Sequence, residues 1–338
     1  MITARLKRFA NELFNPSAVV LMYHRVVEPD QDVWNIQVSP ERFEQQLKFL
    51  KSKYRVLPVA EVVENVQKKT LKRRTIAITF DDGYIDNYLV AKPLLEKYGL
   101  PATFFVTSGN IGKEEEFWWD SLQQLILNSP HLPSLFSMHF GENRLETDLR
   151  GEEHLTQALQ EKHQGWKAYL ETPVSRRSHL FLQLWEQLRP LQPEEQQARL
   201  QEIRSWAGVE QHDRQENRSM NRAQLQDLAR HRLFEVGGHT VAHAFLPAHP
   251  KERQLQELQA NKEFLAQVQG YSVDVFSYPY GGVNEETEQA VREAGFKAAF
   301  TTHERALTNH TTNPFLLGRV QVKNLGGKEF NWLLEYPR

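Results

Sequence analysis

The sequence has no cysteine, no long apolar run and no excess of charge of either sign. Its 338 residues carry a formal net charge of -2 and are 40% hydrophobic. Without cysteine there is no disulfide and no thiolate metal site, so any metal must be held by His, Asp or Glu. The near-neutral charge argues against a nucleic-acid partner, which would call for a basic excess. No stretch reaches the ~20 apolar residues needed to span a bilayer.

The first residues, MITARLKRFANELF, are predicted to form an amphipathic N-terminal helix within 1–15. Ile2, Leu6, Phe9 and Leu13 recur at helical spacing, with basic residues elsewhere on the wheel. The charges leave no apolar core for a signal peptide. Two interpretations stay open: packing on the chain's own domain, or a peripheral anchor on a membrane surface. The missing signal peptide favours a cytoplasmic protein, with peripheral contact at the inner membrane face.

Seven short apolar runs indicate buried strands, and helical patterns lie between most of them. The strands are expected at 18–24, 75–80, 102–107, 233–238, 273–279, 298–302 and 316–322. The clearest helices are expected at 39–54, 87–99, 250–270 and 284–296. Alternation of this kind predicts an α/β protein with a mostly parallel sheet. Seven strands favour a distorted seven-stranded (β/α) barrel over 16–338, with its chemistry at the carboxyl ends of the strands.

Residues 111–220 interrupt this alternation. They are rich in Gln, Glu, Leu and Arg, and their periodicity is helical, with no good strand. We interpret them as a helical insertion after the third strand of the barrel, not as an independent domain.

Two polar motifs follow predicted strands. TFDDGY ends the strand at 75–80 with Asp81 and Asp82, and Asp-Gly alone is a common turn pair. HTVAH follows the strand at 233–238, and its histidines, His239 and His243, lie four residues apart. On a helical turn both imidazoles would face one ion. The second position is Thr240, which excludes the glutamate base of an HExxH zinc protease. Two histidines and one carboxylate would leave open positions on a metal, as in catalytic sites.

Two further strand ends carry candidate residues. FSYPYGG, after the strand at 273–279, is either an exposed turn or a rigid wall that offers Tyr278, Pro279 and Tyr280 to a ligand. LMYHRV closes the first strand with His24, and a single histidine there is more often structural than catalytic.

TFDDG, HTVAH and FSYPYGG, in this order and each at a strand end, resemble the polysaccharide deacetylase family, the NodB-like or family 4 carbohydrate esterases. LMYHRV and AAFTT resemble the branch that includes the poly-N-acetylglucosamine deacetylases. The resemblance covers roughly 18–110 and 221–322 and leaves the insertion outside it. It implies a distorted barrel of about seven strands, in agreement with the strands expected above.

The resemblance also implies distinct roles for the two aspartates. Asp81 would be the general base, while Asp82, His239 and His243 would hold a divalent metal, commonly Zn²⁺. Such an ion activates water and polarises the acetyl carbonyl. The backbone N–H of Tyr280 would hold the oxyanion.

The chain departs from the broad family at two positions. Many members tether the base with an Arg in the FxxPYG stretch, where this chain has Ser277. The family also places an acid His in an LxLH motif on the last strand, where this chain has LLGRVQV and Arg319, which we assign to substrate contact. The leaving amine still needs a proton. His24 is the candidate for the acid, and His303 is a weaker one.

The predicted activity is hydrolysis of an N-acetyl group on an amino sugar, in a glycan or a lipid-linked glycan precursor. Trp118 and Trp119 of the insertion are candidates for sugar stacking, against the alternative of ordinary packing. Two other functions stay open. One is hydrolysis of a different amide, such as an N-formyl sugar, and the other is a catalytically silent barrel that binds glycan.

Overall fold

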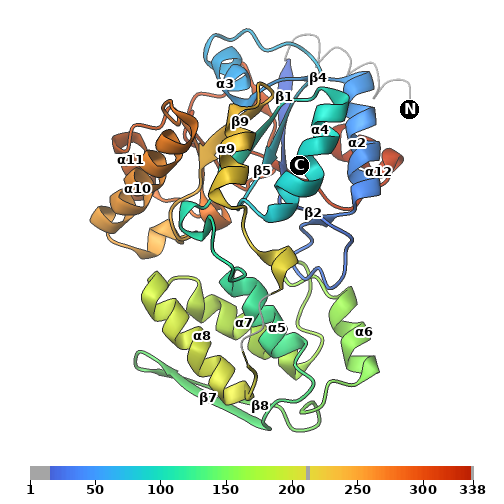
Figure 1. Ribbon diagram of the computed structural model, residues 1–338, viewed down its shortest axis with the longest axis vertical. Coiled ribbons are helices and arrows are strands. Elements are labelled where there is room, and N and C mark those ends of the chain that lie inside the picture. Colours follow the sequence, from blue (N-terminus) through green and yellow to red (C-terminus); the bar gives the residue numbers. More distant parts are fainter. Residues whose placement is uncertain (1–15, 211–213, 336–338) are drawn as a thin grey trace. The chain divides into compact units, whose positions relative to one another are not determined.

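The computed structural model describes residues 16–210 and 214–335, so the helix predicted over 1–15 lies outside the described residues (Figure 1). The chain divides into two compact units. The first comprises residues up to Glu28, Ile36–Gly112 and the chain from Met220 onward. The second comprises Pro29–Asn35 and Lys113–Ser219. The long segment of the second unit, Lys113–Ser219, falls within the insertion that we expected at 111–220.

The first unit contains all seven predicted strands, joined in parallel. They are β1 (Ser17–Tyr23), β5 (Thr75–Phe80), β6 (Ala102–Val106), β9 (Phe234–Gly238), β10 (Val275–Ser277), β11 (Ala298–Phe300) and β13 (Val320–Gln321). Their order is β11-β10-β9-β6-β5-β1, and β13 pairs with β1. A bridge from Leu317 to Phe300 links the segment before β13 back to β11. The prediction of a distorted (β/α) barrel is confirmed.

Four shorter strands were not expected. Strand β4 (Arg55–Val56) lies parallel to β5, and β12 (Leu307–Thr308) lies antiparallel to β1. Strands β2 (Arg25–Val26) and β3 (Gln37–Val38) pair with each other as a separate two-stranded sheet.

Helices surround the sheet of the first unit, with α10 and α11 on one side and α2 and α12 on another (Figure 1). Their bounds are α2 (Pro40–Lys53), α3 (Val59–Gln67), α4 (Lys92–Tyr98) after a π-turn at Asn87–Ala91, α9 (Arg222–Arg230), α10 (Lys251–Gln269), α11 (Glu285–Glu293) and α12 (Gly327–Glu335). Ser39 caps α2 by accepting the Arg42 N–H at 3.2 Å. Gly99 and Gly270 end α4 and α10 in the left-handed conformation.

Strand β5 explains why polar side chains gather at one end of the sheet. All six of its residues are buried, as expected for a parallel strand covered on both faces. Successive side chains alternate, so Asp81, directly after the strand, lies on the same face as Ala77 and Thr79. A carboxylate on that face must find partners inside the protein.

The second unit is mainly helical, as predicted. Its helices are α5 (Trp118–Leu127), α6 (Gln157–Gly165), α7 (Arg176–Leu188) and α8 (Pro193–Ala207). The expectation of no strand is wrong, because β7 (Leu135–Phe140) and β8 (Asn143–Asp148) form an antiparallel hairpin that turns at Gly141, with φ of 59°. Most side chains of this hairpin are not buried, so its apolar pattern is sparse in the sequence. Among the described residues no helix combines the length and the apolarity that a membrane span requires.

Candidate functional site

The turn after β5 separates the two aspartates. The Asp81 N–H donates to the Tyr23 carbonyl at 3.0 Å, which extends the ladder between β5 and β1. The chain then reverses, with φ of 73° at Asp82 and a Gly83 N–H to Asp81 carbonyl bond of 3.0 Å. An i to i+2 bond around a residue of positive φ is a strained γ-turn. Both side chains are buried, at 2% and 4% exposed, and the reversal turns them in different directions.

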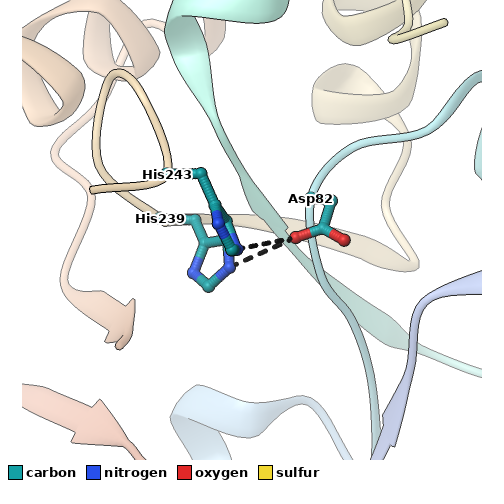
Figure 2. A group of neighbouring side chains, drawn as sticks. All are labelled: Asp82, His239 and His243. Atoms are coloured by element: carbon teal, nitrogen blue, oxygen red, sulfur yellow. Dashed lines mark ion pairs between the residues drawn. The ribbon is translucent and has the colours of Figure 1, made fainter. Parts of the chain in front are cut away.

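Asp82, His239 and His243 converge on one point. Figure 2 shows both imidazoles facing the Asp82 carboxylate, with the His239 Nε2 to Asp82 Oδ1 distance at 3.4 Å and the His243 Nε2 to Asp82 Oδ1 distance at 3.2 Å. One ligand atom from each residue lies within 4.8 Å of the others. Within the described chain, Asp82 Oδ1 accepts no hydrogen bond despite its burial. A carboxylate and two imidazoles arranged in this way fit a divalent metal ion.

The protonation states suit ligation. The His239 Nδ1 lies 2.7 Å from the Ser277 carbonyl, which can only accept, so Nδ1 carries the proton and Nε2 keeps its lone pair. Burial lowers the pKa of His243 and favours its neutral form. Burial alone would raise the pKa of Asp82, but the interaction with the two imidazoles outweighs burial and leaves the pKa well below its ordinary value.

The two histidines do not lie on a helix, so the helical turn that we expected is wrong. Residues 239–243 form a bend in which Thr240 and His243 have φ of 62° and 55°. The Thr240 Oγ1 accepts the Ala244 N–H at 3.1 Å and stabilises this bend. Two left-handed residues bring the imidazoles together, at 4.8 Å between ring centroids, instead of the i, i+4 face of a helix.

Helix α10 supports the bend with two buried polar residues that the sequence analysis missed. Glu257 accepts the N–H groups of Val241 and Ala242, each at 2.9 Å. Asn261 accepts the His239 N–H at 3.1 Å and donates to the Thr240 carbonyl at 2.6 Å. The two are spaced i, i+4, so they share one face of the helix. These bonds satisfy backbone groups that left-handed turns leave unpaired.

Asp81 is held by a buried arginine. The Arg319 Nη1 and Nη2 atoms each lie 2.7 Å from one Asp81 oxygen, in a bidentate pair. Arg319 is fully buried, and its other donors reach Thr79 Oγ1, the Thr301 carbonyl and Ser277 Oγ. All five donors of the guanidinium are therefore occupied. The predicted substrate contact by Arg319 is wrong, since the side chain has neither exposed surface nor a remaining donor.

The arrangement also explains Ser277, the position where the resemblance implies an arginine tether. Ser277 donates to Asp81 Oδ2 at 3.2 Å and accepts from Arg319 at 2.7 Å, so the small residue leaves room for a guanidinium from another strand end. Burial by itself would raise the pKa of Asp81. The Arg319 charge and hydrogen bonds, with His239 and His24, outweigh burial and lower that pKa.

His24 directly follows Tyr23, whose carbonyl accepts the Asp81 N–H at 3.0 Å, so the two strand ends that carry His24 and Asp81 lie side by side. Its Nδ1 is buried and has no hydrogen-bond partner within the described chain. The backbone around it is fixed by Asp86, which accepts the Val26 N–H at 2.8 Å and pairs with Arg25 at 2.9 Å. Asn87 donates to the His24 carbonyl at 2.8 Å. The weaker candidate, His303, is exposed.

The two tyrosines of the SYPYGG segment lie in different surroundings. Tyr278 is fully buried in the core, edge-on to Phe276 at 5.3 Å, and Pro279 is also buried. The predicted substrate contact by the Tyr278 ring and by Pro279 is wrong for that reason. Tyr280 is half-buried, has φ of 58°, and packs edge-on against the His243 ring at 4.4 Å. Tyr280 is thus the tyrosine of this segment that borders the ligand cluster.

Trp118 and Trp119 are packed inside the second unit. They are 5% and 6% exposed, and Trp119 stacks on Phe117 at 4.6 Å. Their faces are covered by the protein's own side chains, so the packing interpretation holds and sugar stacking on them is wrong.

Comparison with known proteins agrees with this geometry. The family described as "Polysaccharide deacetylase" matches residues 68–136 and 203–299. A Staphylococcus aureus protein named poly-beta-1,6-N-acetyl-D-glucosamine N-deacetylase is 34% identical over 111 residues, which are 29% of this chain and 38% of that protein. The chain therefore matches little more than a third of the length of this curated relative.

Solved structures show a similar fold. The Streptococcus pyogenes deacetylase PplD, in complex with acetate, has a TM-score of 0.54 at 19% identity, covering 96% of this chain and 100% of that one. IcaB from Ammonifex degensii has a TM-score of 0.53 at 20% identity, covering 94% of this chain and 95% of that one. At such identities the likeness shows the fold alone. The matched residues include Asp81, Asp82, His239, His243 and the SYPYGG segment, and we conclude that the chain belongs to the polysaccharide deacetylase family.

Proposed function

We propose that the protein is a metal-dependent hydrolase that removes an acetyl group from an amino sugar of a glycan. The observation that carries this proposal is that two carboxylates at the end of β5 have different surroundings. Asp81 is neutralised by Arg319, and Asp82 faces two imidazoles without a fixed cation. A hydrolase needs one group to move a proton and another to bind an electrophile.

Asp82, His239 and His243 would hold the ion, and two imidazoles with one carboxylate are a ligand set found in catalytic zinc sites. When bound, a divalent ion at these ligands lowers the pKa of a water molecule and polarises an amide carbonyl. The remaining steps belong to side chains and backbone groups of the chain.

Asp81 would act as the general base. Its low pKa keeps it ionised, and Arg319 fixes its orientation. Oδ2 accepts from Arg319 and Ser277, whereas Oδ1 accepts from Arg319 and keeps a lone pair for a water proton. Water attacks the acetyl carbon, the C–N bond breaks, and the oxygen of water ends in acetate.

The nitrogen that leaves must gain a proton, and His24 would supply it. His24 directly follows Tyr23, whose carbonyl accepts the Asp81 N–H, so it belongs to the strand end next to the two aspartates. The backbone N–H of Tyr280 would donate to the oxyanion that forms on the carbonyl. The products are acetate and a free amine on the sugar.

The substrate class follows from the family and from the Staphylococcus aureus relative, whose name specifies poly-β-1,6-N-acetyl-D-glucosamine. We propose an amino-sugar polysaccharide or its precursor. N-formyl sugars would use the same residues and are therefore a second arm of the test.

The test uses the zinc-loaded full chain with β-1,6-linked N-acetylglucosamine oligomers and their N-formyl counterparts. Released acetate, released formate and free amine are measured. We expect acetate and amine in equal amounts, and Asp81→Asn should lower the rate by about 10²–10⁴-fold while it retains one bound metal. No acid released by the wild type from any substrate, with oligomer binding unchanged in Asp81→Asn, would instead show a glycan-binding protein.

The proton donor is tested separately. His24→Gln should lower kcat by about 10²–10⁴-fold and leave metal content unchanged, whereas the matched variant His303→Gln should keep full activity. The opposite result would assign the proton to His303.

A further inference from the structure

A basic pocket lies at the opposite end of the barrel from the candidate site. It has a volume of about 720 Å³ and is bounded by the first residues of β1 and β5, the end of α2, and α12. In Figure 1, α2 and α12 lie at the right of the first unit. Its charged lining residues are Lys53, Arg73, Arg74, Lys328 and Glu335.

The charge of this pocket differs from that of the whole chain. Four cationic residues and one carboxylate line it, which gives +4 - 1 = +3, whereas the chain of 338 residues carries -2. Within the described chain, the side chains of Lys53, Arg74 and Lys328 form no ion pair. Elsewhere in the first unit a lysine does pair, since Lys97 lies 2.8 Å from Glu44. Among the described residues, these three cations of the pocket are therefore not neutralised by an acidic side chain.

The chain that enters β5 adds to this charge. The stretch KKTLKRR at 68–74 has five cations in seven residues. Lys68 pairs with Glu64, one turn earlier on α3. Such a run attracts anionic surfaces.

Apolar groups lie beside the cations. Val19, Phe49, Ile76 and Leu334 line the same pocket. Trp332, on the helix that forms one wall, is 55% exposed. Tryptophan next to lysine and arginine is typical of surfaces that lie at the interface of a lipid bilayer. A free phosphate would use the cations alone, whereas a lipid would use the apolar wall as well.

We propose that this end of the barrel docks on a membrane surface and that the pocket takes the phosphate headgroup of an anionic phospholipid. The segment 1–15, amphipathic by its sequence, leads into Ser17 of this pocket. Docking through the amino ends of the strands leaves the carboxyl ends, which carry Asp81 and the ligand cluster, directed away from the bilayer. The protein would then act on glycan held near a membrane.

The experiment measures sedimentation of the full chain with vesicles at 0.1 M salt. Vesicles of phosphatidylglycerol and phosphatidylcholine should bind the protein, and pure phosphatidylcholine should bind it weakly. Lys53→Gln with Lys328→Gln should weaken binding about 25-fold, which is about fivefold for each charge removed. The matched control, Lys113→Gln with Lys162→Gln, removes two exposed lysines of the second unit and should bind as the wild type does.

Three results would overturn the proposal. They are equal binding of both double variants to anionic vesicles, equal binding of the wild type to neutral and anionic vesicles, and complete displacement from vesicles by millimolar inorganic phosphate at constant ionic strength. The first would attribute binding to a surface outside the pocket, such as the segment 1–15. The third would make the pocket a site for a soluble phosphate. Because all four lysines are exposed, the variants should keep the wild-type Tm.

Discussion

Asp81 and Asp82 are neighbours in the chain, yet the two sides of the site to which they belong are built differently. The base side consists of Asp81, Arg319 and Ser277, and its carboxylate has a fixed cation 2.7 Å away. The metal side consists of Asp82, His239 and His243, and its carboxylate faces two imidazoles. The first side has a net charge of zero, whereas the second, with neutral histidines, has a net charge of -1.

This difference indicates where a cation is needed. A buried charge is costly unless it is paired, and the base side is paired by the protein itself. The metal side is buried to a similar degree but has no cationic side chain, so a divalent ion would complete it. The γ-turn thus separates Asp81, whose charge is paired with Arg319, from Asp82, whose charge has no cationic side chain beside it among the described residues.

The largest effect is expected from a change on the metal side. His239→Ala or Asp82→Ala removes one of three ligands, so stoichiometric zinc binding and activity should both be lost. Zinc content by elemental analysis and acetate release check this result. Asp81→Asn is the matched change on the other side and should keep the zinc. Undiminished zinc in His239→Ala would contradict the ligand assignment.

A change on the base side should act mainly on stability. Arg319→Met leaves the Asp81 charge buried without a partner, which should lower the free energy of unfolding by about 3–5 kcal/mol. Urea denaturation of the metal-free protein measures it. Adding Asp81→Asn to Arg319→Met should recover much of the loss, because the uncompensated charge disappears. Additive losses in this double variant would show that Asp81 and Arg319 do not act as a pair.

A smaller effect is expected from a residue that supports the backbone of the metal side. Asn261→Leu removes the bonds that hold His239 and Thr240, so the Kd for zinc should rise about 10–100-fold. Competition with a chelator of known affinity measures the Kd. Glu263→Gln, on the exposed face of the same helix, is the matched control and should leave the Kd unchanged. An equal Kd in both variants would reduce Asn261 to a purely structural residue.

The parts of the fold and site that follow from local patterns could be predicted from the sequence. Apolar runs indicated the seven strands, and Asp81, Asp82, His239 and His243 follow directly after two of them. The pairing of Arg319 with Asp81 joins residues 238 positions apart, and no local pattern encodes such a contact. The resemblance even indicated that a tether was missing at Ser277, but the position of its replacement depends on how the strands meet.

The support from α10 does leave a signal in the sequence. Leu258 and Leu265 lie on the buried stripe of this helix, and Glu257 and Asn261 are buried with them. Polar residues on an apolar stripe need partners, so they often mark a bond to a loop. The bend at 239–243 has no such signal. Thr240 and His243 adopt the left-handed backbone conformation, which is rare for residues other than glycine.

The smallest effect is expected where the sequence pattern was ambiguous. Tyr278 and Tyr280 look alike in SYPYGG, but only Tyr280 borders the metal side, while the buried Tyr278 hydroxyl has no hydrogen-bond partner among the described residues. Tyr278→Phe should therefore leave kcat/KM unchanged and raise the free energy of unfolding by up to about 1 kcal/mol, because a buried unpaired hydroxyl is costly. Steady-state kinetics and urea denaturation check both values. A lower kcat/KM in Tyr278→Phe would extend the metal side to this ring and reinstate it as a substrate contact.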